Sequence, residues 1–362
     1  RFTQADAGKT FTYTLSEVVP DKKLGGVTYD QTTYKIAIQV VDNADGTMKT
    51  ITTVSKNGGD PVGTYDSSDG RDVVTLGFKN AYKAAPVEVS PDTADLGLYK
   101  VLKGRDWLAT DSFHFTMKSA VPGQPESAVA EKDVAAPGAQ EGDKVPFSFG
   151  SYTFDAPGTY YYAVDETPGN IPGISYDGHS ARVVVDVTDN LEGKLVADIE
   201  VIKGVFTNTY EAELAHDAAG GLIIAKTTKG HDMAEGQFKF QVQAMDGKGT
   251  TAAETAKRIG IGQGTADTFG NVAGKDGVRV EMKSPAPLKF TQADAGKSFE
   301  FKVSELGANG KPGAGGTKDG YTYSDAVYTI DLAVADNFNG NLTLTTKVID
   351  KDNKTTTTES TA

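Results

Sequence analysis

The sequence repeats itself at a fixed interval, and this repetition predicts a tandem array of one structural unit. FTQADAGKTFTYTLSE at 2–17 returns as FTQADAGKSFEFKVSE at 290–305, and a looser version, FDAPGTYYYAVDE, lies at 154–166. Each copy leads into a second marker, which is GVTYD at 26–30, GISYD at 173–177 and GYTYS at 320–324. These marker tyrosines stand 147 residues apart in both steps: Tyr29, Tyr176 and Tyr323.

The repeats divide the 362 residues into three units of unequal completeness. We expect residues 1–84 to be the C-terminal portion of a domain, 95–211 a complete domain, and 221–362 a domain that lacks its last strand. Residues 84–94 and 212–220, which are rich in Pro, Ala and Asp, are predicted linkers. Unequal units of this kind are expected in a segment of a longer chain.

Alternation of apolar and polar residues predicts an all-β fold. Three alternating runs each enter a glycine-containing turn, DNADG at 42–46, DNLEG at 189–193 and DNFNG at 336–340, and a return strand follows each turn. These turns lack the ligand spacing of an EF-hand, so hairpin turns are favoured over calcium loops. AAETAKRIG at 252–260 predicts a short helix.

Composition excludes several classes of function. The net charge of −13 argues against nucleic acid and anionic lipid as partners, because both require clustered basic residues. No run is apolar enough to span a bilayer, and no cysteine is present for a disulfide. The four histidines have neither metal-ligand nor triad-like spacing, and no phosphate-binding loop is found. We therefore expect no metal, no cofactor and no enzyme with multiple turnovers.

Three polar residue types recur in one order on the predicted inward faces of strands: Lys, Glu and Asn. The second unit has all three, the first has Glu and Asn, and the third has Lys and Glu. In sequence order they are Glu17, Asn80, Lys100, Glu166, Asn208, Lys226 and Glu305. Residues two apart in a strand share a face, and the neighbours on each of these faces are aromatic or aliphatic.

Buried polar groups cost free energy unless they are satisfied, and two arrangements would satisfy this set. One is a buried Lys–Glu ion pair with the Asn hydrogen bonded beside it. The other is an amide bond between Lys and Asn, promoted by Glu. Burial lowers the pKa of Lys and raises that of Glu, so a neutral amine would attack the Asn carbonyl while Glu shuttles the proton. The second arrangement is the favoured prediction, with Lys100 and Asn208 as the complete pair. Asn80 and Lys226 are expected to have partners outside their own units.

These residues resemble the isopeptide-linkage domains of Gram-positive pilins and adhesins, both Cna-B-like and streptococcal backbone-pilin-like. The matched features are a Lys followed by Gly four residues on (Lys100 and Gly104), the Y-x-V-x-E type segment, and the closing F-x-N-x-Y strand. The resemblance covers nearly the whole chain. It implies tandem Ig-like β-sandwiches, a Lys–Asn cross-link between opening and closing strands, and a structural role in an extracellular cell-surface fibre anchored to the cell wall.

Two forms of this role stay open, a pilus shaft and the stalk of a single long adhesin, and the near-identity of the FTQADAG segments favours the stalk. Neighbouring repeats or subunits of the same fibre are the expected partners. The alternative function is an adhesin domain that binds a glycan or a host surface protein. Trp107 and the tyrosines at 160–162 are the aromatic candidates for a sugar platform.

Overall fold

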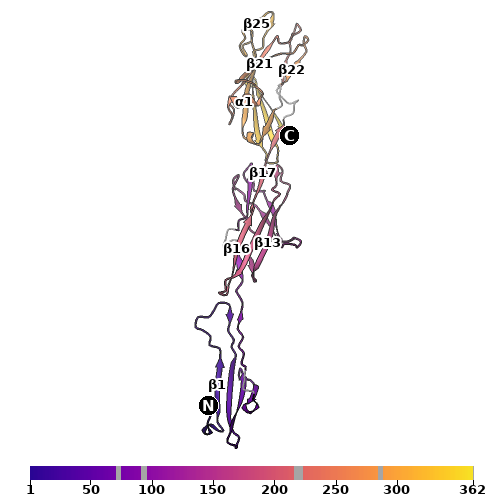
Figure 1. Ribbon diagram of the computed structural model, residues 1–362. Helices are drawn as coiled ribbons and strands as arrows, with labels where there is room; N and C mark the ends of the chain where they lie inside the picture. Colours follow the sequence, from indigo (N-terminus) through magenta and orange to yellow (C-terminus); the bar gives the residue numbers. More distant parts are fainter. Residues whose placement is uncertain (71–74, 91–95, 216–222, 284–287, 362) are drawn as a thin grey trace.

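The computed structural model describes residues 1–70, 75–90, 96–215, 223–283 and 288–361. Three β-rich units follow one another along the axis of an elongated molecule, with the first unit at one end and the third at the other (Figure 1). The fold is all-β, as predicted. The short helix α1 (Ala252–Arg258) confirms the helix expected at 252–260, and Thr251 caps its N-terminus by accepting from the Glu254 amide.

The second unit is a sandwich of two sheets. Its five-stranded sheet has the order β10-β9-β13-β15-β16, and its four-stranded sheet has the order β11-β8-β17-β14. The strands are β8 (Tyr99–Lys103), β9 (Phe113–Ser119), β10 (Ser127–Val134), β11 (Val145–Pro146), β12 (Tyr152–Phe154), β13 (Gly158–Thr167), β14 (Ile174–Ser175), β15 (Ser180–Asp189), β16 (Leu195–Ile202) and β17 (Val205–Tyr210). The inward-facing residues of both sheets form one apolar core between them.

The third unit has one six-stranded sheet, in the order β21-β20-β24-β27-β28-β29, and a separate pair formed by β19 and β22. Its strands are β19 (Ile223–Lys226), β20 (Lys239–Ala244), β21 (Ala266–Gly270), β22 (Val280–Lys283), β23 (Lys289–Thr291), β24 (Ser298–Glu305), β25 (Thr317–Lys318), β26 (Tyr321–Thr322), β27 (Val327–Asp336), β28 (Leu342–Ile349) and β29 (Thr355–Thr361).

The first unit has a four-stranded sheet in the order β1-β3-β4-β5 and a short pair formed by β2 and β6. Its strands are β1 (Thr10–Ser16), β2 (Val27–Thr28), β3 (Thr33–Asp42), β4 (Met48–Lys56), β5 (Pro61–Asp66) and β6 (Ala81–Tyr82). Single 3₁₀ turns lie at Gln4–Asp6, Ser67–Asp69 and Gln292–Asp294.

The three DNxxG segments are hairpin turns, as predicted. Each joins an antiparallel pair at the same register: β3 with β4, β15 with β16, and β27 with β28. The residue after Asp-Asn has a left-handed backbone in all three turns, with φ of 58° at Ala44, 59° at Leu191 and 60° at Phe338. The Asp side chain accepts a hydrogen bond from that residue's amide and so fixes the turn.

The predicted linkers are wrong in part. Strand β7 (Val87–Val89) pairs with β12 of the second unit, and β18 (Glu213–Ala215) pairs with β23 of the third. The sequence reading missed these strands because Pro, Ala and Asp are poor strand formers, whereas docking on the next unit provides tertiary partners. Residues 91–94 and 216–220 of those segments lie outside the described part of the chain.

The prediction that Tyr13 and Leu15 of β1 face the interior is also wrong, because both side chains are exposed. Tyr13 and Leu15 are 53% and 41% exposed, whereas Val164 and Val303, which match Leu15 in the other units, are 0% and 4% exposed. Strand parity is correct, but among the described residues no second sheet covers this face of the first unit. Alternation therefore shows which residues share a face, and not what covers that face.

This difference in burial between the first and second units predicts a difference in the stability of their variants. Phe115 is fully buried, with its ring centroid 5.0 Å from that of Phe206. We expect Phe115→Ala to lower the free energy of unfolding of the second unit by about 3–5 kcal/mol, because it leaves a cavity in a close-packed core. The exposed Tyr13→Ala control should change stability by less than about 0.5 kcal/mol. Calorimetric unfolding of both variants checks this, and equal shifts would contradict the burial pattern.

Candidate functional site

The second unit brings its Lys, Glu and Asn together between the two sheets. Lys100 Nζ lies 2.8 Å from Glu166 Oε2. Asn208 Nδ2 donates to the other carboxyl oxygen, Glu166 Oε1, at 2.6 Å. Lys100 and Asn208 are fully buried, and Glu166 is only 6% exposed. The three predicted residues therefore share one carboxyl group in the core.

Strand register explains why these residues meet. Strands β8 and β17 are parallel neighbours in one sheet, with Lys100 opposite Phe206 and Asn208 opposite Leu102. All four residues have the same strand parity, so their side chains lie on one face of the sheet. Glu166 comes from β13 of the facing sheet and reaches across the sandwich. A one-residue slip of either strand would turn Lys100 or Asn208 away from the core.

Burial shifts the pKa values of Lys100 and Glu166 in the directions that favour their neutral forms. Desolvation lowers the pKa of Lys100 from 10.5 to about 8, although the nearby Glu166 carboxylate opposes the shift. Desolvation likewise raises the pKa of Glu166 above its ordinary value, while Lys100 opposes that change. The Lys100 ammonium lies 4.7 Å from the centre of the Phe113 ring, so its surroundings are aromatic rather than aqueous.

A fourth residue, Asp177, belongs to this site and was missed by sequence reasoning. Its backbone amide donates to Asn208 Oδ1 at 2.8 Å, so it polarises the side-chain carbonyl. Its Oδ2 accepts from the Thr207 amide at 2.7 Å and holds the strand next to Asn208. The available signal was positional: Asp177 directly follows marker Tyr176, as Asp30 follows Tyr29.

The first unit repeats part of this arrangement without a lysine. Asn80 Nδ2 donates to Glu17 Oε1 at 2.7 Å, and the Asp30 amide donates to Asn80 Oδ1 at 2.8 Å. Asp30 Oδ2 also accepts from the Lys79 amide at 2.6 Å, as Asp177 does from Thr207. Unlike Asn208, Asn80 is exposed. Glu17 and Asn80 are thus brought together, but outside a closed core.

The third unit holds the complementary part of the arrangement without an asparagine. Lys226 Nζ lies 2.9 Å from each oxygen of Glu305. The Ser324 amide, which follows marker Tyr323, donates to Glu305 Oε2 at 3.1 Å, whereas the matching Asp177 amide donates to Asn208. Lys226, Glu305 and Ser324 line an open groove beside β19 and β24. Lys226 Nζ also lies 4.2 Å from the centre of the Phe238 ring.

The described residues offer little support for other chemistry. They contain no group of three His, Asp or Glu side chains placed to hold a metal ion. None of the helices in the described ranges is long and apolar enough to cross a membrane.

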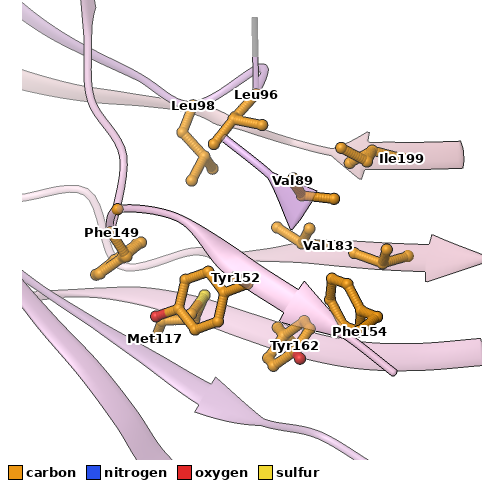
Figure 2. Close-up of a pocket in the computed structure, with 12 residues that line it drawn as sticks. Val89, Leu96, Leu98, Met117, Phe149, Tyr152, Phe154, Tyr162, Val183 and Ile199 are labelled. Atoms are coloured by element: carbon orange, nitrogen blue, oxygen red, sulfur yellow. The ribbon is translucent and has the colours of Figure 1, made fainter. Parts of the chain in front are cut away.

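The apolar cavity of the second unit lies apart from the Lys100 site. Figure 2 shows Tyr152 and Phe154 on one side of it and Val183 and Ile199 on another. Among the described residues that line it there is no carboxylate, histidine or basic side chain, so these residues provide no groups for acid–base chemistry.

The aromatic residues proposed for a sugar platform are not arranged as one. Trp107 is 3% exposed and packs edge-on against Phe113, with ring centroids 5.1 Å apart. Tyr160 and Tyr162 are half-buried. These contacts make Trp107 a core residue, which removes the main observation behind the glycan-binding alternative.

Comparison with protein-family models gives a match that covers most of the chain. A family model described as "Spy0128-like isopeptide containing domain" (FctA) matches residues 1–83, 96–211 and 222–360. No curated protein matches the chain.

Solved structures show a weaker likeness. The major pilin from Streptococcus pyogenes matches at 15% sequence identity and a TM-score of 0.29, over 73% of this chain and 98% of that chain. The major pilin T-13 from Streptococcus pyogenes matches at 16% identity and a TM-score of 0.23, over 69% and 87%. At TM-scores this low, the structural likeness adds nothing to the family match.

The electrostatics of the second unit predict how Lys100 titrates. In an Asn208→Ala variant, which keeps Lys100 as a free amine, its side-chain NMR signals should titrate with a midpoint near pH 8. Because the folded pKa lies below the ordinary 10.5, the unfolded chain binds more protons between these values. The contribution of Lys100 to the free energy of unfolding should therefore rise from about pH 8 to about pH 10.5. A midpoint at or above 10.5 would contradict the burial argument.

Proposed function

Because the chain belongs to the family of Spy0128-like isopeptide-containing domains, we propose that Lys100 and Asn208 form an amide bond within the second unit, promoted by Glu166. The chain is a structural, non-enzymatic protein of a pilus shaft. This family assignment favours the shaft over the single-chain stalk and over a ligand-binding adhesin domain. The cross-link is a single event in the maturation of each unit, so no turnover is involved.

One observation carries the proposal: the amine and the carboxamide are hydrogen bonded to opposite oxygens of the same buried carboxyl group. In this geometry Glu166 takes a proton from the Lys100 ammonium and leaves a neutral amine. The amine nitrogen attacks Asn208 Cγ, whose carbonyl is polarised by the Asp177 amide.

The proton balance closes on the same carboxyl. Glu166 delivers that proton to the side-chain nitrogen of Asn208, which leaves as ammonia when its C–N bond breaks. Glu166 then accepts the second proton that the Lys100 nitrogen loses as the new amide bond forms. The overall reaction joins a primary amine to a carboxamide and releases one ammonia, without oxidant or cofactor. Burial of all three groups provides the effective molarity and the neutral protonation states that this step requires.

A buried ion pair with a neighbouring Asn is the competing arrangement, and two features argue against it. A buried ion pair is often no more stable than an apolar core, since both charges lose their hydration. The lowered pKa of Lys100 and the raised pKa of Glu166 also move the pair away from full ionisation. A neutral amine beside a polarised carbonyl is the arrangement that reacts.

The position of the proposed bond suits a load-bearing shaft. It would join β8 to β17, the parallel strands at the opening and the close of the second unit, and span about 109 residues. Tension entering near one strand would pass through the bond to the other, so the sheets between them would not extend.

The other two units are proposed to take their missing groups from outside themselves. Glu17 and Asn80 require a lysine, and Lys226 and Glu305 require an asparagine. Family membership implies assembly with neighbouring pilin subunits in a cell-surface pilus. We extend this to neighbouring repeats of the same fibre as the source of these groups, and to cell-wall attachment of the parent protein. A host surface ligand stays a prediction.

Intact mass tests the bond directly. The 362-residue chain is expected to weigh one ammonia less than its sequence requires, because only the second unit holds all three groups. Lys100→Ala and Glu166→Ala should each restore the full mass. They should also destabilise the second unit by roughly 4–5 kcal/mol, by analogy with the closure of a long disulfide loop.

Lys226→Ala is the matched control, since it removes a lysine that also faces a glutamate but has no asparagine within its unit. This variant should keep the deficit of one ammonia. A wild-type chain of full mass, under conditions in which it is folded, would overturn the covalent proposal and leave the ion pair.

A further inference from the structure

The contact between the first and second units is centred on a tyrosine hydroxyl. Tyr82, two residues after Asn80, reaches the DNxxG turn of the next unit. Its hydroxyl donates to Asp189 Oδ1 at 2.8 Å and accepts from the Gly193 amide at 3.2 Å. The turn is thereby held at both of its ends.

The contact between the second and third units is the same. Tyr210, two residues after Asn208, donates to Asp336 Oδ1 at 2.7 Å and accepts from the Gly340 amide at 3.3 Å. Burial and the Asp336 carboxylate raise the pKa of Tyr210 to about 12, so the hydroxyl stays a proton donor at any physiological pH.

In both contacts a glycine of the turn also packs against a glycine of the preceding unit. A Cβ on Gly193 would lie 2.2 Å from the nitrogen of Gly26, three residues before marker Tyr29. A Cβ on Gly340 would lie 2.8 Å from the nitrogen of Gly173, three residues before marker Tyr176. The two backbones thus approach more closely than any side chain would permit.

The chain leaving each unit also pairs with the turn in the same way. Ala85, three residues after Tyr82, forms a parallel bridge with Lys194. Glu213, three residues after Tyr210, forms one with Asn341. The two junctions therefore share a hydroxyl, a glycine contact and a backbone bridge at matching positions, although the sequences around them differ.

The first unit has the acceptor half of this junction, uncovered by any described residue. Asp42 and Gly46 are exposed, whereas Gly193 is buried and Asp189 and Asp336 are half-buried. Asp42 Oδ1 accepts from the Ala44 amide at 2.9 Å, and Gln4 donates to Oδ2 at 2.6 Å. The corresponding bonds at Asp336, from Phe338 and Gln292, coexist with the bond from Tyr210.

We propose that the DNxxG turn is a docking site for the closing end of a preceding repeat, and that the turn Asp42–Gly46 of the first unit takes such a repeat. The occupant presents a tyrosine two residues after the asparagine of its last strand and a glycine three residues before its marker tyrosine. A carboxylate oxygen accepts more than one hydrogen bond, so the bond from Ala44 leaves room for the hydroxyl.

The matched positions also define what the site rejects. Phenylalanine in place of the tyrosine would leave the Asp Oδ1 without the hydrogen bond from the hydroxyl. Any larger residue in place of either glycine would hold the two backbones apart. The site is thus selective for repeats of this kind, and it fixes their orientation because three contacts at separate points define one placement.

The native chain provides the first test. Tyr210→Phe should speed amide hydrogen exchange at Gly340 by about tenfold, since that amide loses its acceptor. Tyr160→Phe is the matched control, because the Tyr160 hydroxyl bonds Ala156 within its own unit. Gly340 exchange that is the same in Tyr210→Phe and Tyr160→Phe would overturn the role of the hydroxyl.

The second test covers the free turn. Residues 96–288 are fused in front of Arg1 of the full chain. A second copy of the second unit, and of the part of the third unit from β19 to β22, then precedes the first unit. Arg1 then takes the position that Lys289 has in the third unit, and Phe2 takes that of Phe290. Exchange at the Gly46 amide should slow by about tenfold in the fusion relative to the native chain.

Tyr210→Phe in the added copy should return Gly46 to the rate of the native chain, and Tyr160→Phe in the added copy should not. A Lys100–Asn208 mass deficit in the added copy verifies that this copy is folded. If the added copy is folded and exchange at Gly46 is unchanged, the proposal is overturned. The readout is an amide at the junction, so it is separate from formation of the cross-link.

Discussion

The contact of Lys100 and Asn208 with the two oxygens of Glu166 is the constraint on which the second unit depends. Three polar side chains meet at the centre of a sandwich, among the residues of its apolar core. Each would be costly alone, and each is satisfied only when both sheets are in register. The site therefore helps to specify the pairing of β8 with β17, and the same burial lowers the pKa of Lys100 and raises that of Glu166.

The first and third units show what each member of the set contributes. In the first unit Glu17 and Asn80 meet with no lysine beside them among the described residues, but Asn80 is exposed and so are Tyr13 and Leu15 on the face of β1. In the third unit Lys226 contacts both oxygens of Glu305, and the Ser324 amide donates to that carboxylate, whereas the matching Asp177 amide donates to Asn208. The glutamate is thus the fixed centre of the site, and the strands that carry Lys and Asn close it from either side.

The same closing strand serves two purposes in the molecule. Asn208 faces the core of its own unit, and Tyr210, on the same face two residues on, reaches the turn of the next unit. A proposed covalent bond within a unit and a hydrogen-bonded joint between units are therefore only two residues apart along β17. The elongated arrangement of the units in Figure 1 is consistent with this continuity, since little chain lies between the two.

The sequence by itself determined the repeat, the hairpin turns, and the strand faces on which Lys100, Glu166 and Asn208 lie, because a period of two residues is a local property of the backbone. It did not reveal β7 and β18, whose pairing depends on a neighbouring unit, or the exposure of Tyr13 and Leu15, which depends on whether a second sheet is present. Asp177 and Tyr210 also acquired their roles only in three dimensions. Their partners lie 30 residues or more away in the sequence, and only tertiary contact decides such pairings.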